Sequence, residues 1–383
     1  MLFRSAGGSL VVAVSALAAL TLLPAVLGML GRRVERYPVL PRRLRRDDPQ
    51  AAWARLARVV MRRPWRFIVG SLAVVAVLAA PARNATLNVP RADVLPTSFD
   101  SRRGQEVIDA QFRQALLEPI VLAIPRGQDV ARIVARARAV PGVAAVAGVQ
   151  RGPGGTAVSL IGAPNPSSSA ARDLVERLRA LPGHGRAFWV TGETAGELDF
   201  LAQIESRAPW AVALIFAATY IVLLVAFGSL LLPLKAILMN TLSIAGAIGV
   251  LVWVFQDGNL GVQPLGYIES TMPVVIFCAL FGVSMDYAVF MLSRIAEAYR
   301  AGASNRDAVT IGLVATGRII TSAAAILVVI GLAFTTADVI IVKELGLGLA
   351  IAIGLDATLV RSLLVPATMR VLGDWNWWPR GRG

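Results

Sequence analysis

Long apolar runs constrain the fold of this 383-residue chain more than any other sequence feature. A helix needs about 20 mostly apolar residues to cross a bilayer. Hydrophobic residues make up 56% of the chain and charged residues only 16%, against about 25% charged in typical globular proteins. The sequence therefore predicts a membrane all-α bundle of about seven transmembrane helices. The predicted spans cover roughly residues 9–30, 66–82, 208–228, 231–254, 271–293, 309–334 and 344–371.

The positive charge is distributed unevenly along the chain. Residues 32–66 contain twelve arginines and three acidic residues, whereas residues 83–206 contain fourteen arginines and twelve acidic residues. Cytoplasmic loops are enriched in basic residues, so we predict a cytoplasmic basic linker over 31–65. Alternation then puts 83–207 outside and the tail 372–383 inside. The net charge is +14, and its uneven placement beside apolar runs indicates anionic membrane lipids as partners, not nucleic acid. Together with the predicted spans, it indicates a multi-pass protein of the cell (inner) membrane.

The segment 83–207 is too polar to be membrane and too long for a connecting loop. Strand-like runs alternate with amphipathic stretches in the order strand–helix–strand–strand–helix–strand, which is that of a split βαβ, ferredoxin-like domain. We therefore predict an α+β extracytoplasmic domain between the second and third spans, with a binding or gating role. Ser168 or Ser169 is the expected N-cap of its second helix. The predicted strands cover 119–124, 143–149, 157–161 and 187–191, and the predicted helices cover 129–140 and 168–181.

Charged residues inside membrane spans are costly and mark functional candidates. Asp286 lies in the fifth predicted span, where we expect it to be buried. Desolvation would favour its neutral, protonated form, which makes it a candidate proton carrier. Tyr287 follows it, but adjacent helical residues point about 100° apart. A partner for Asp286 is therefore expected from another helix.

The last two spans carry further charges. Asp356 and Arg361 are five residues apart, about 140° around an α-helix, so a direct pair between them is expected to be poor. Arg318 either pairs with Asp356 or extends to the cytoplasmic face. The remaining charges lie at span ends, where solvated anchoring is expected: Arg294, Lys235 and the Lys343–Glu344 pair.

The reactive residue types give no sign of catalysis. The single cysteine, Cys278, lies in an apolar run and is expected to be a small buried side chain. The single histidine, His184, lies in a turn and is expected to be solvated. We find no nucleophile–base pair and no metal-ligand cluster, so the sequence predicts no enzyme, no cofactor and no metal.

Several segments resemble one family of transporters. Residues Phe281–Arg294 read FGVSMDYAVFMLSR and resemble the signature helix of MMPL-type transporters, a branch of the resistance–nodulation–division (RND) superfamily. Residues Leu355–Arg361 (LDATLVR) resemble the final helix of that family. The segment Gly373–Trp378 (GDWNWW) is similar to its usual ending, and Leu20–Ala25 (LTLLPA) is similar to the end of its sixth helix.

The resemblance implies a function. Members of that family have two similar halves of six spans, each with a porter domain, and they export lipids, lipid-linked metabolites or drugs using the proton gradient. An Asp–Tyr pair from each half forms the proton relay. By resemblance, Asp286 binds the proton, Tyr287 is its cross-half partner, and Asp356, Arg361 and Arg294 are supporting polar residues. Many relatives carry an acid directly after Asp–Tyr, where this chain has an alanine.

The resemblance also assigns the domains. Residues 1–30 correspond to the last helix of a first half, 66–82 to the first span of the second half, 83–207 to its porter domain and 208–371 to its five-helix bundle. The other Asp–Tyr pair has no counterpart. We therefore expect a truncated or split gene product, or a chain that pairs with another half or another protomer. The alternative function is a non-transporting, lipid-binding or sterol-sensing-like scaffold, against which the costly Asp286 argues.

Overall fold

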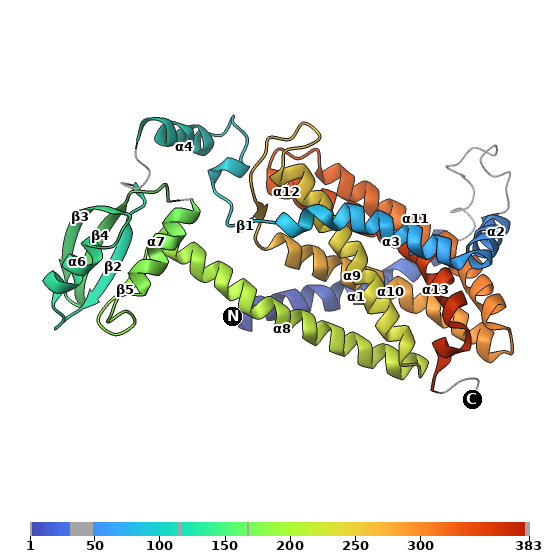
Figure 1. Ribbon diagram of the computed structural model, residues 1–383. Helices are drawn as coiled ribbons and strands as arrows, with labels where there is room; N and C mark the ends of the chain where they lie inside the picture. The colour runs from blue at the N-terminus through green and yellow to red at the C-terminus, as the bar shows by residue number, and fades with distance from the viewer. Residues whose placement is uncertain (1, 31–48, 113–116, 167, 380–383) are drawn as a thin grey trace. The chain divides into compact units, whose positions relative to one another are not determined.

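The computed structural model describes residues 2–30, 49–112, 117–166 and 168–379 (Figure 1). The chain divides into two compact units, Met1–Ala52 and Trp53–Gly383. The first unit contains the apolar helix α1 (Leu2–Leu30). The predicted cytoplasmic linker lies outside the described residues up to residue 48, and its remainder forms the amphipathic helix α2 (Pro49–Arg62).

Six helices in the described part of the chain are long and apolar enough to cross a membrane, and each overlaps a predicted span. The remaining predicted span, 9–30, falls in α1, whose apolar stretch Ala13–Val26 is shorter, so the count of seven stays a prediction. The six cover Pro64–Asn84 with α3 (Pro64–Ala79), Glu193–Phe227 (α8), Leu231–Gln256 with α9 (Leu231–Leu251), Met272–Arg300 (α10), Asn305–Phe334 (α11), and Ile340–Trp377 with α12 (Ile340–Leu355) and α13 (Val365–Leu372).

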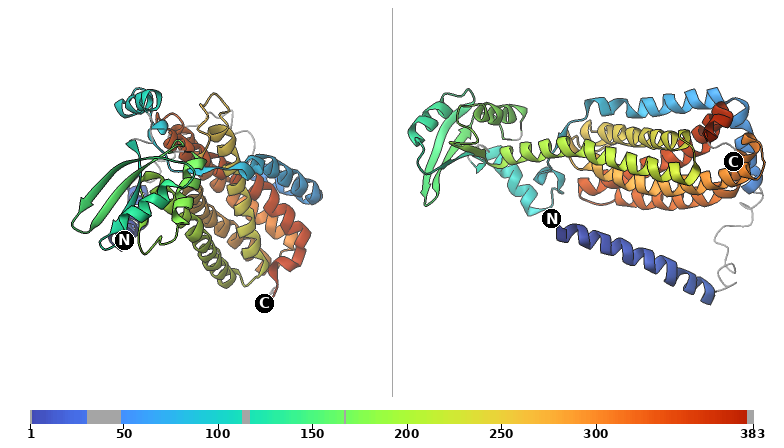
Figure 2. Two further views of the ribbon diagram at one scale, coloured as in Figure 1. Left: turned by 60° about the vertical axis from the view of Figure 1, so that its left-hand side comes forward. Right: turned by 90° about the horizontal axis from the view of Figure 1, so that it is seen from below.

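Helix α9 is central to the bundle, because it packs against α3, α8, α10 and α12 (Figure 2). Small residues permit the closest helix contacts. A Cβ atom on Gly249 of α9 would overlap the backbone of Leu78 and Ala79 in α3. In the same way, Gly346 of α12 lies directly against Gly331 of α11. The spans therefore form one packed bundle.

The contact at Gly346 gives a stability prediction. Replacing Gly346 by alanine should lower the free energy of unfolding by about 1–3 kcal/mol, because the new methyl group would overlap the Gly331 carbonyl oxygen and the Phe334 side chain. Gly354 on the same helix is the matched control, since its nearest neighbour for a Cβ atom is Val328 at 3.9 Å. Gly354→Ala should be neutral or stabilising by up to about 1 kcal/mol. Denaturant unfolding in detergent measures both; equal effects would contradict the packing described.

The polar segment between α3 and α8 contains a four-stranded antiparallel sheet of order β3-β4-β2-β5. Both of its helices pack on one face, because Leu122 and Leu160 share a buried core with Ile133 and Leu174. Alternate residues of β2 are buried, as expected of a strand with one solvated face. The elements are β2 (Ile120–Pro125), α6 (Val130–Arg138), β3 (Val143–Gly152), β4 (Gly155–Gly162), α7 (Ser169–Arg179) and β5 (Trp189–Thr191).

These elements follow the predicted order of strands and helices. Of the two candidate N-caps for α7, the structure selects Ser168, whose hydroxyl accepts a hydrogen bond from the Ala171 backbone N–H at 3.2 Å. Two features were not predicted. Helix α4 (Asp100–Gln111) precedes the sheet, and β1 (Leu87–Asn88) pairs in parallel with β6 (Ile268–Glu269). The second feature connects the segment after α3 to the segment that enters α10.

Candidate functional site

A buried ion pair lies in the last span. The helix changes from α to π geometry over Asp356–Leu364, and a π-helix bonds residue i to residue i+5. Residues five apart therefore lie about one turn above each other. Arg361 Nε donates to Asp356 Oδ2 at 2.7 Å, and both side chains are about 95% buried (4% and 5% exposed). The prediction of a poor direct pair was wrong, because it assumed α-helical geometry throughout.

Two polar side chains from neighbouring helices complete this cluster. Ser284 of α10 places its hydroxyl 2.5 Å from Asn240 Oδ1 and 2.9 Å from Asp356 Oδ2. A hydroxyl has one proton, so Ser284 can donate to one of these oxygens at a time. Arg361 Nη2 donates to the Ser284 hydroxyl at 2.7 Å and to the Ser284 carbonyl oxygen. We call these four residues, Asn240, Ser284, Asp356 and Arg361, the central cluster; they join α9, α10 and the last span.

The central cluster borders a small cavity. The side chains that line it are those of Asn240, Asp356, Arg361 and Lys235, together with several apolar ones. The volume that a water molecule can occupy there is about 20 Å³. That volume admits about one water molecule. Lys235 was predicted to be a solvated anchor, but its side chain is half-buried and donates to Asn376 Oδ1 at 3.2 Å. Polar atoms therefore extend from the cluster toward the end of the bundle where α9 begins.

Asp286 lies within the fifth span, as predicted, but its side chain is exposed. It forms no hydrogen bond or ion pair with the part of the chain that the structure describes. Val275, Cys278 and Gly282 are exposed on the same face of α10 at helical spacing. The expectation that Asp286 and Cys278 would be buried was therefore wrong. This face of α10 points away from the bundle, and we call it the outward face of α10.

Tyr287 lies between the outward face and the central cluster. It is half-buried, and the Arg361 guanidinium carbon is 5.3 Å from the centre of its ring, a distance typical of a cation–π contact. Arg361 thus contacts both Asp356 and the neighbour of Asp286. The two arginines considered as further members lie elsewhere: Arg294 pairs with Glu297 at 2.9 Å on the surface, and Arg318 is exposed and does not pair with Asp356.

The structure therefore brings together Tyr287, Asp356 and Arg361 of the predicted site residues. Sequence reasoning missed Ser284 and Asn240. Both are hydrogen-bonding side chains inside predicted spans, and that signal would have identified them as candidates, because intramembrane polar side chains generally bond to neighbouring helices.

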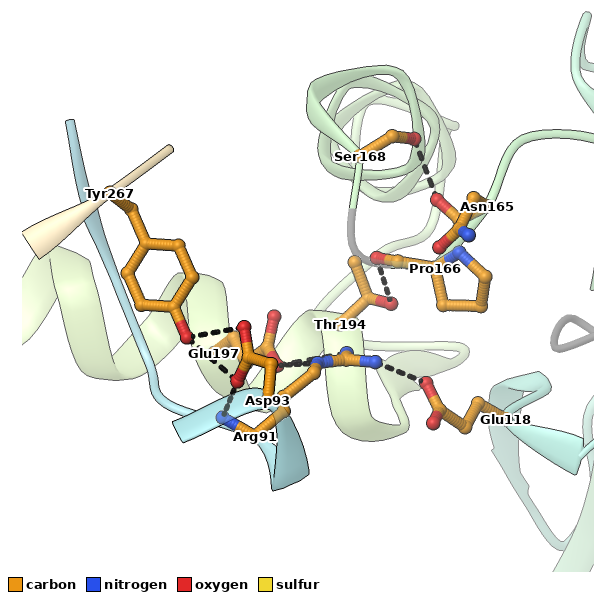
Figure 3. Close-up of polar contacts among 9 residues, drawn as sticks. All are labelled: Arg91, Asp93, Glu118, Asn165, Pro166, Ser168, Thr194, Glu197 and Tyr267. Atoms are coloured by element: carbon orange, nitrogen blue, oxygen red, sulfur yellow. Dashed lines mark hydrogen bonds and ion pairs between the residues drawn. The ribbon is translucent and has the colours of Figure 1, made fainter. Parts of the chain in front are cut away.

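A second polar cluster is centred on Arg91 (Figure 3). Arg91, in the segment after α3, donates to Glu118 Oε2 at 2.8 Å through Nη1 and to Glu197 Oε1 at 2.9 Å through Nη2. Burial lowers the pKa of Arg91, but the neighbouring carboxylates of Glu197 and Glu118 outweigh burial and raise it. Arg91 thus holds together the start of the sheet domain and the first turns of α8.

Tyr267 joins the same segment to the residues that precede α10. Its hydroxyl donates to the Asp93 carboxylate, at 2.8 Å from Oδ2, and Asp93 Oδ1 accepts from the Arg91 backbone N–H at 3.1 Å (Figure 3). Burial raises the pKa of Tyr267, and the hydrogen bond to Asp93 raises it further. Tyr267 therefore stays protonated, and remains a hydrogen-bond donor, at pH values well above the usual pKa of a tyrosine.

This contact predicts a pH-dependent stability. Folded Tyr267 keeps a proton that an unfolded tyrosine releases near pH 10, so its contribution to stability should be present below about pH 10 and decline as the pH rises further. The Tyr267→Phe variant should not show that decline. At neutral pH its free energy of unfolding should be lower by about 1.5–3 kcal/mol, the range for a hydrogen bond to a charged group. Unfolding midpoints against pH test both. Tyr220→Phe is the control, and parallel curves for wild type and Tyr267→Phe would contradict the assignment.

Comparison with known proteins adds independent information. The model of the MMPL family matches residues 6–67 and 159–382. The chain is 37% identical to the membrane protein SCO6666 of Streptomyces coelicolor, over 96% of this chain and 52% of that protein. It is 32% identical to the trehalose monomycolate exporter MmpL3 of Mycobacterium tuberculosis, over 96% of this chain and 44% of that protein. The mycolic acid-containing lipids exporter MmpL11 of Mycolicibacterium smegmatis is 34% identical, over 97% and 41%. The chain thus spans about half the length of these relatives.

Proposed function

The chain belongs to the MMPL family and is a multi-pass protein of the cell membrane, and on that premise we propose that it takes part in proton-driven export of a lipid, lipid-linked metabolite or drug. The observation that carries this proposal is the central cluster. Burying Asp356 and Arg361 among apolar helices is costly, and a helix bundle needs no such pair for packing alone. A device that moves protons does need charged groups at that depth.

In the proposed relay, Asp286 is the proton-binding residue. Its exposure on the outward face of α10 suits a group that meets a second six-span half or another protomer. Tyr287 connects Asp286 to the central cluster through the ring contact with Arg361. Asp356 is already compensated by Arg361 and Ser284, so we assign these residues to holding Arg361 in place. Arg294, at the surface, receives only an anchoring role.

We interpret the sheet domain as the extracytoplasmic porter-like module. An antiparallel sheet of order β3-β4-β2-β5 with two helices on one face is the arrangement of a ferredoxin-like domain. Arg91 ties this domain to α8, and the β1–β6 pairing reaches the segment before α10. Movement of the domain can therefore be transmitted to the helix that carries Asp286.

The substrate class rests on the relatives. Two of them are named as exporters, one of trehalose monomycolate and one of mycolic acid-containing lipids. We therefore favour a lipid or another hydrophobic molecule as the substrate, and transport in place of catalysis as the activity. The partner required by the relay is a first half, whether on the same polypeptide or on another.

The proposal is tested by export from cells that naturally carry the chain, compared with cells from which it has been deleted. Labelled cell-envelope lipids should reach the outer face of the membrane more slowly in the deletion strain. A protonophore, which collapses the proton gradient, should reduce wild-type export to the level of the deletion strain. Lipid binding by the chain together with export that is indifferent to both treatments would support a non-transporting scaffold instead.

A further inference from the structure

A second buried carboxylate, remote from the central cluster, lies at the start of the last span. Glu344 is in the second turn of α12 and is 1% exposed. The backbone N–H of Glu269 lies near it, but neither Glu344 oxygen has a hydrogen-bond partner within 3.5 Å among the described residues. The expectation of a solvated anchor at this position was therefore wrong.

A second buried carboxylate, that of Glu269, lies beside Glu344. Glu269 is 7% exposed, and its oxygens are well satisfied. Oε1 accepts from the Thr271 backbone N–H at 3.0 Å and from the Ser270 hydroxyl at 3.3 Å, and Oε2 accepts from the Thr271 hydroxyl at 2.5 Å. Both oxygens of Glu269 thus have hydrogen-bond donors within 3.5 Å. The two carboxylates are thus unequal, because among the described residues Glu344 has no donor within 3.5 Å of either oxygen.

No cation compensates this site in the part of the chain that the structure describes. The titratable groups that face Glu344 from the elements packed against it are Glu269 of β6 and Tyr267 just before it, which in turn bonds to Asp93. No ion pair joins Glu344 to an arginine or lysine of the described residues. Lys343 precedes it, but adjacent helical residues point about 100° apart.

A proton is the ligand that fits this geometry. An ionised carboxylate without hydrogen bonds or a counter-charge is strongly disfavoured in an apolar interior, and a neighbouring carboxylate adds repulsion. The described residues contain no group of three His, Cys, Asp or Glu side chains that could hold a metal ion. A bound proton removes both the unpaired charge and the repulsion.

The position of Glu344 in the span gives this proton a role. It precedes Asp356 by twelve residues on the same helix, about 18 Å of helical rise. With the orientation inferred from the arginine-rich segments, the start of α12 and the segment before α10 face the extracytoplasmic side. We propose that Glu344 is a second protonation site. It takes up a proton at the outer end of the bundle, and that proton then moves toward the cytoplasmic side. This inference rests on the proposed proton-driven function.

Infrared spectroscopy of the full chain in lipid vesicles tests the bound proton without any substrate. Wild type should show the carbonyl-stretch band of a protonated carboxyl group, and Glu344→Gln should lose it. Glutamine keeps the size and neutrality of the protonated acid, so this variant should fold. Glu297→Gln is the control, because Glu297 is an exposed carboxylate paired with Arg294, and it should retain the band. An unchanged band in Glu344→Gln would overturn the proposal.

Proton flux into vesicles that contain the chain together with the first half it pairs with tests whether that proton moves. Glu344→Gln should slow gradient-driven flux by about tenfold or more, because the site can no longer exchange a proton, whereas Glu297→Gln should leave it unchanged. Wild-type flux in Glu344→Gln would show a static buried acid and would overturn the proposal. If Asp286→Asn retained wild-type flux, the proposed relay would fail, and the infrared band would still decide whether Glu344 binds a proton.

Discussion

Asp286→Asn is expected to abolish proton-dependent export while leaving the thermal unfolding of the chain unchanged. The side chain is exposed on the outward face of α10 and bonds to no described residue, so its replacement removes no hydrogen bond or ion pair from the bundle. Asparagine has nearly the same size but cannot take up and release a proton. Export of labelled lipid from cells and unfolding of the purified chain measure the two parts of this prediction.

The control for this substitution is Asp257→Asn. Asp257 is also exposed, but it follows the fourth span and lies outside the proposed relay. It should change neither export nor unfolding. Wild-type export in cells carrying Asp286→Asn would contradict the role assigned to Asp286. Loss of export together with a large drop in unfolding temperature would point to a structural role for this aspartate.

Arg361→Leu is expected to have the largest effect on stability. Removing one partner of a buried ion pair leaves the other charge uncompensated, at a typical cost of about 3–5 kcal/mol. Both partners are almost fully buried here, and Arg361 also donates to Ser284. Because typical proteins are stable by only about 5–15 kcal/mol, this single change should remove a large share of the stability of the bundle.

A double-mutant cycle separates the ion pair from general packing. Asp356→Leu combined with Arg361→Leu removes both charges, so the double variant should be markedly more stable than the sum of the two single effects predicts. The expected coupling is at least about 1 kcal/mol, read from denaturant unfolding of all four proteins. Additive effects would contradict a direct interaction between Asp356 and Arg361.

The spans and the sheet domain could be predicted because their signals are local. A run of about 20 apolar residues identifies a span wherever its neighbours lie, and a short apolar run identifies β2 from its own residues. Which face of a span points inward carries no such signal. Lipid and helix bundle are both apolar, so hydropathy could not show that Asp286 and Cys278 lie on the outward face of α10.

Changes in helix geometry and long-range contacts also could not be predicted from the sequence. The Asp356–Arg361 pair depends on a π-helical segment. The residues between Asp356 and Arg361 carry no sequence signal for a change from α to π geometry. Arg91 meets Glu118 and Glu197 across 27 and 106 residues of chain, and carboxylates scattered among arginines look alike whether they are solvated or paired. The position of Glu344 near a span end predicts a solvated anchor, although the side chain is buried there.

Proton movement itself tests the central claim most directly, because it requires no knowledge of the substrate. The full chain, with the first half it pairs with, is placed in vesicles that contain a pH-sensitive dye, and a pH gradient is imposed. Wild type should carry protons across the membrane, and Asp286→Asn should reduce the flux to that of protein-free vesicles. Equal flux through wild type and Asp286→Asn would contradict the account.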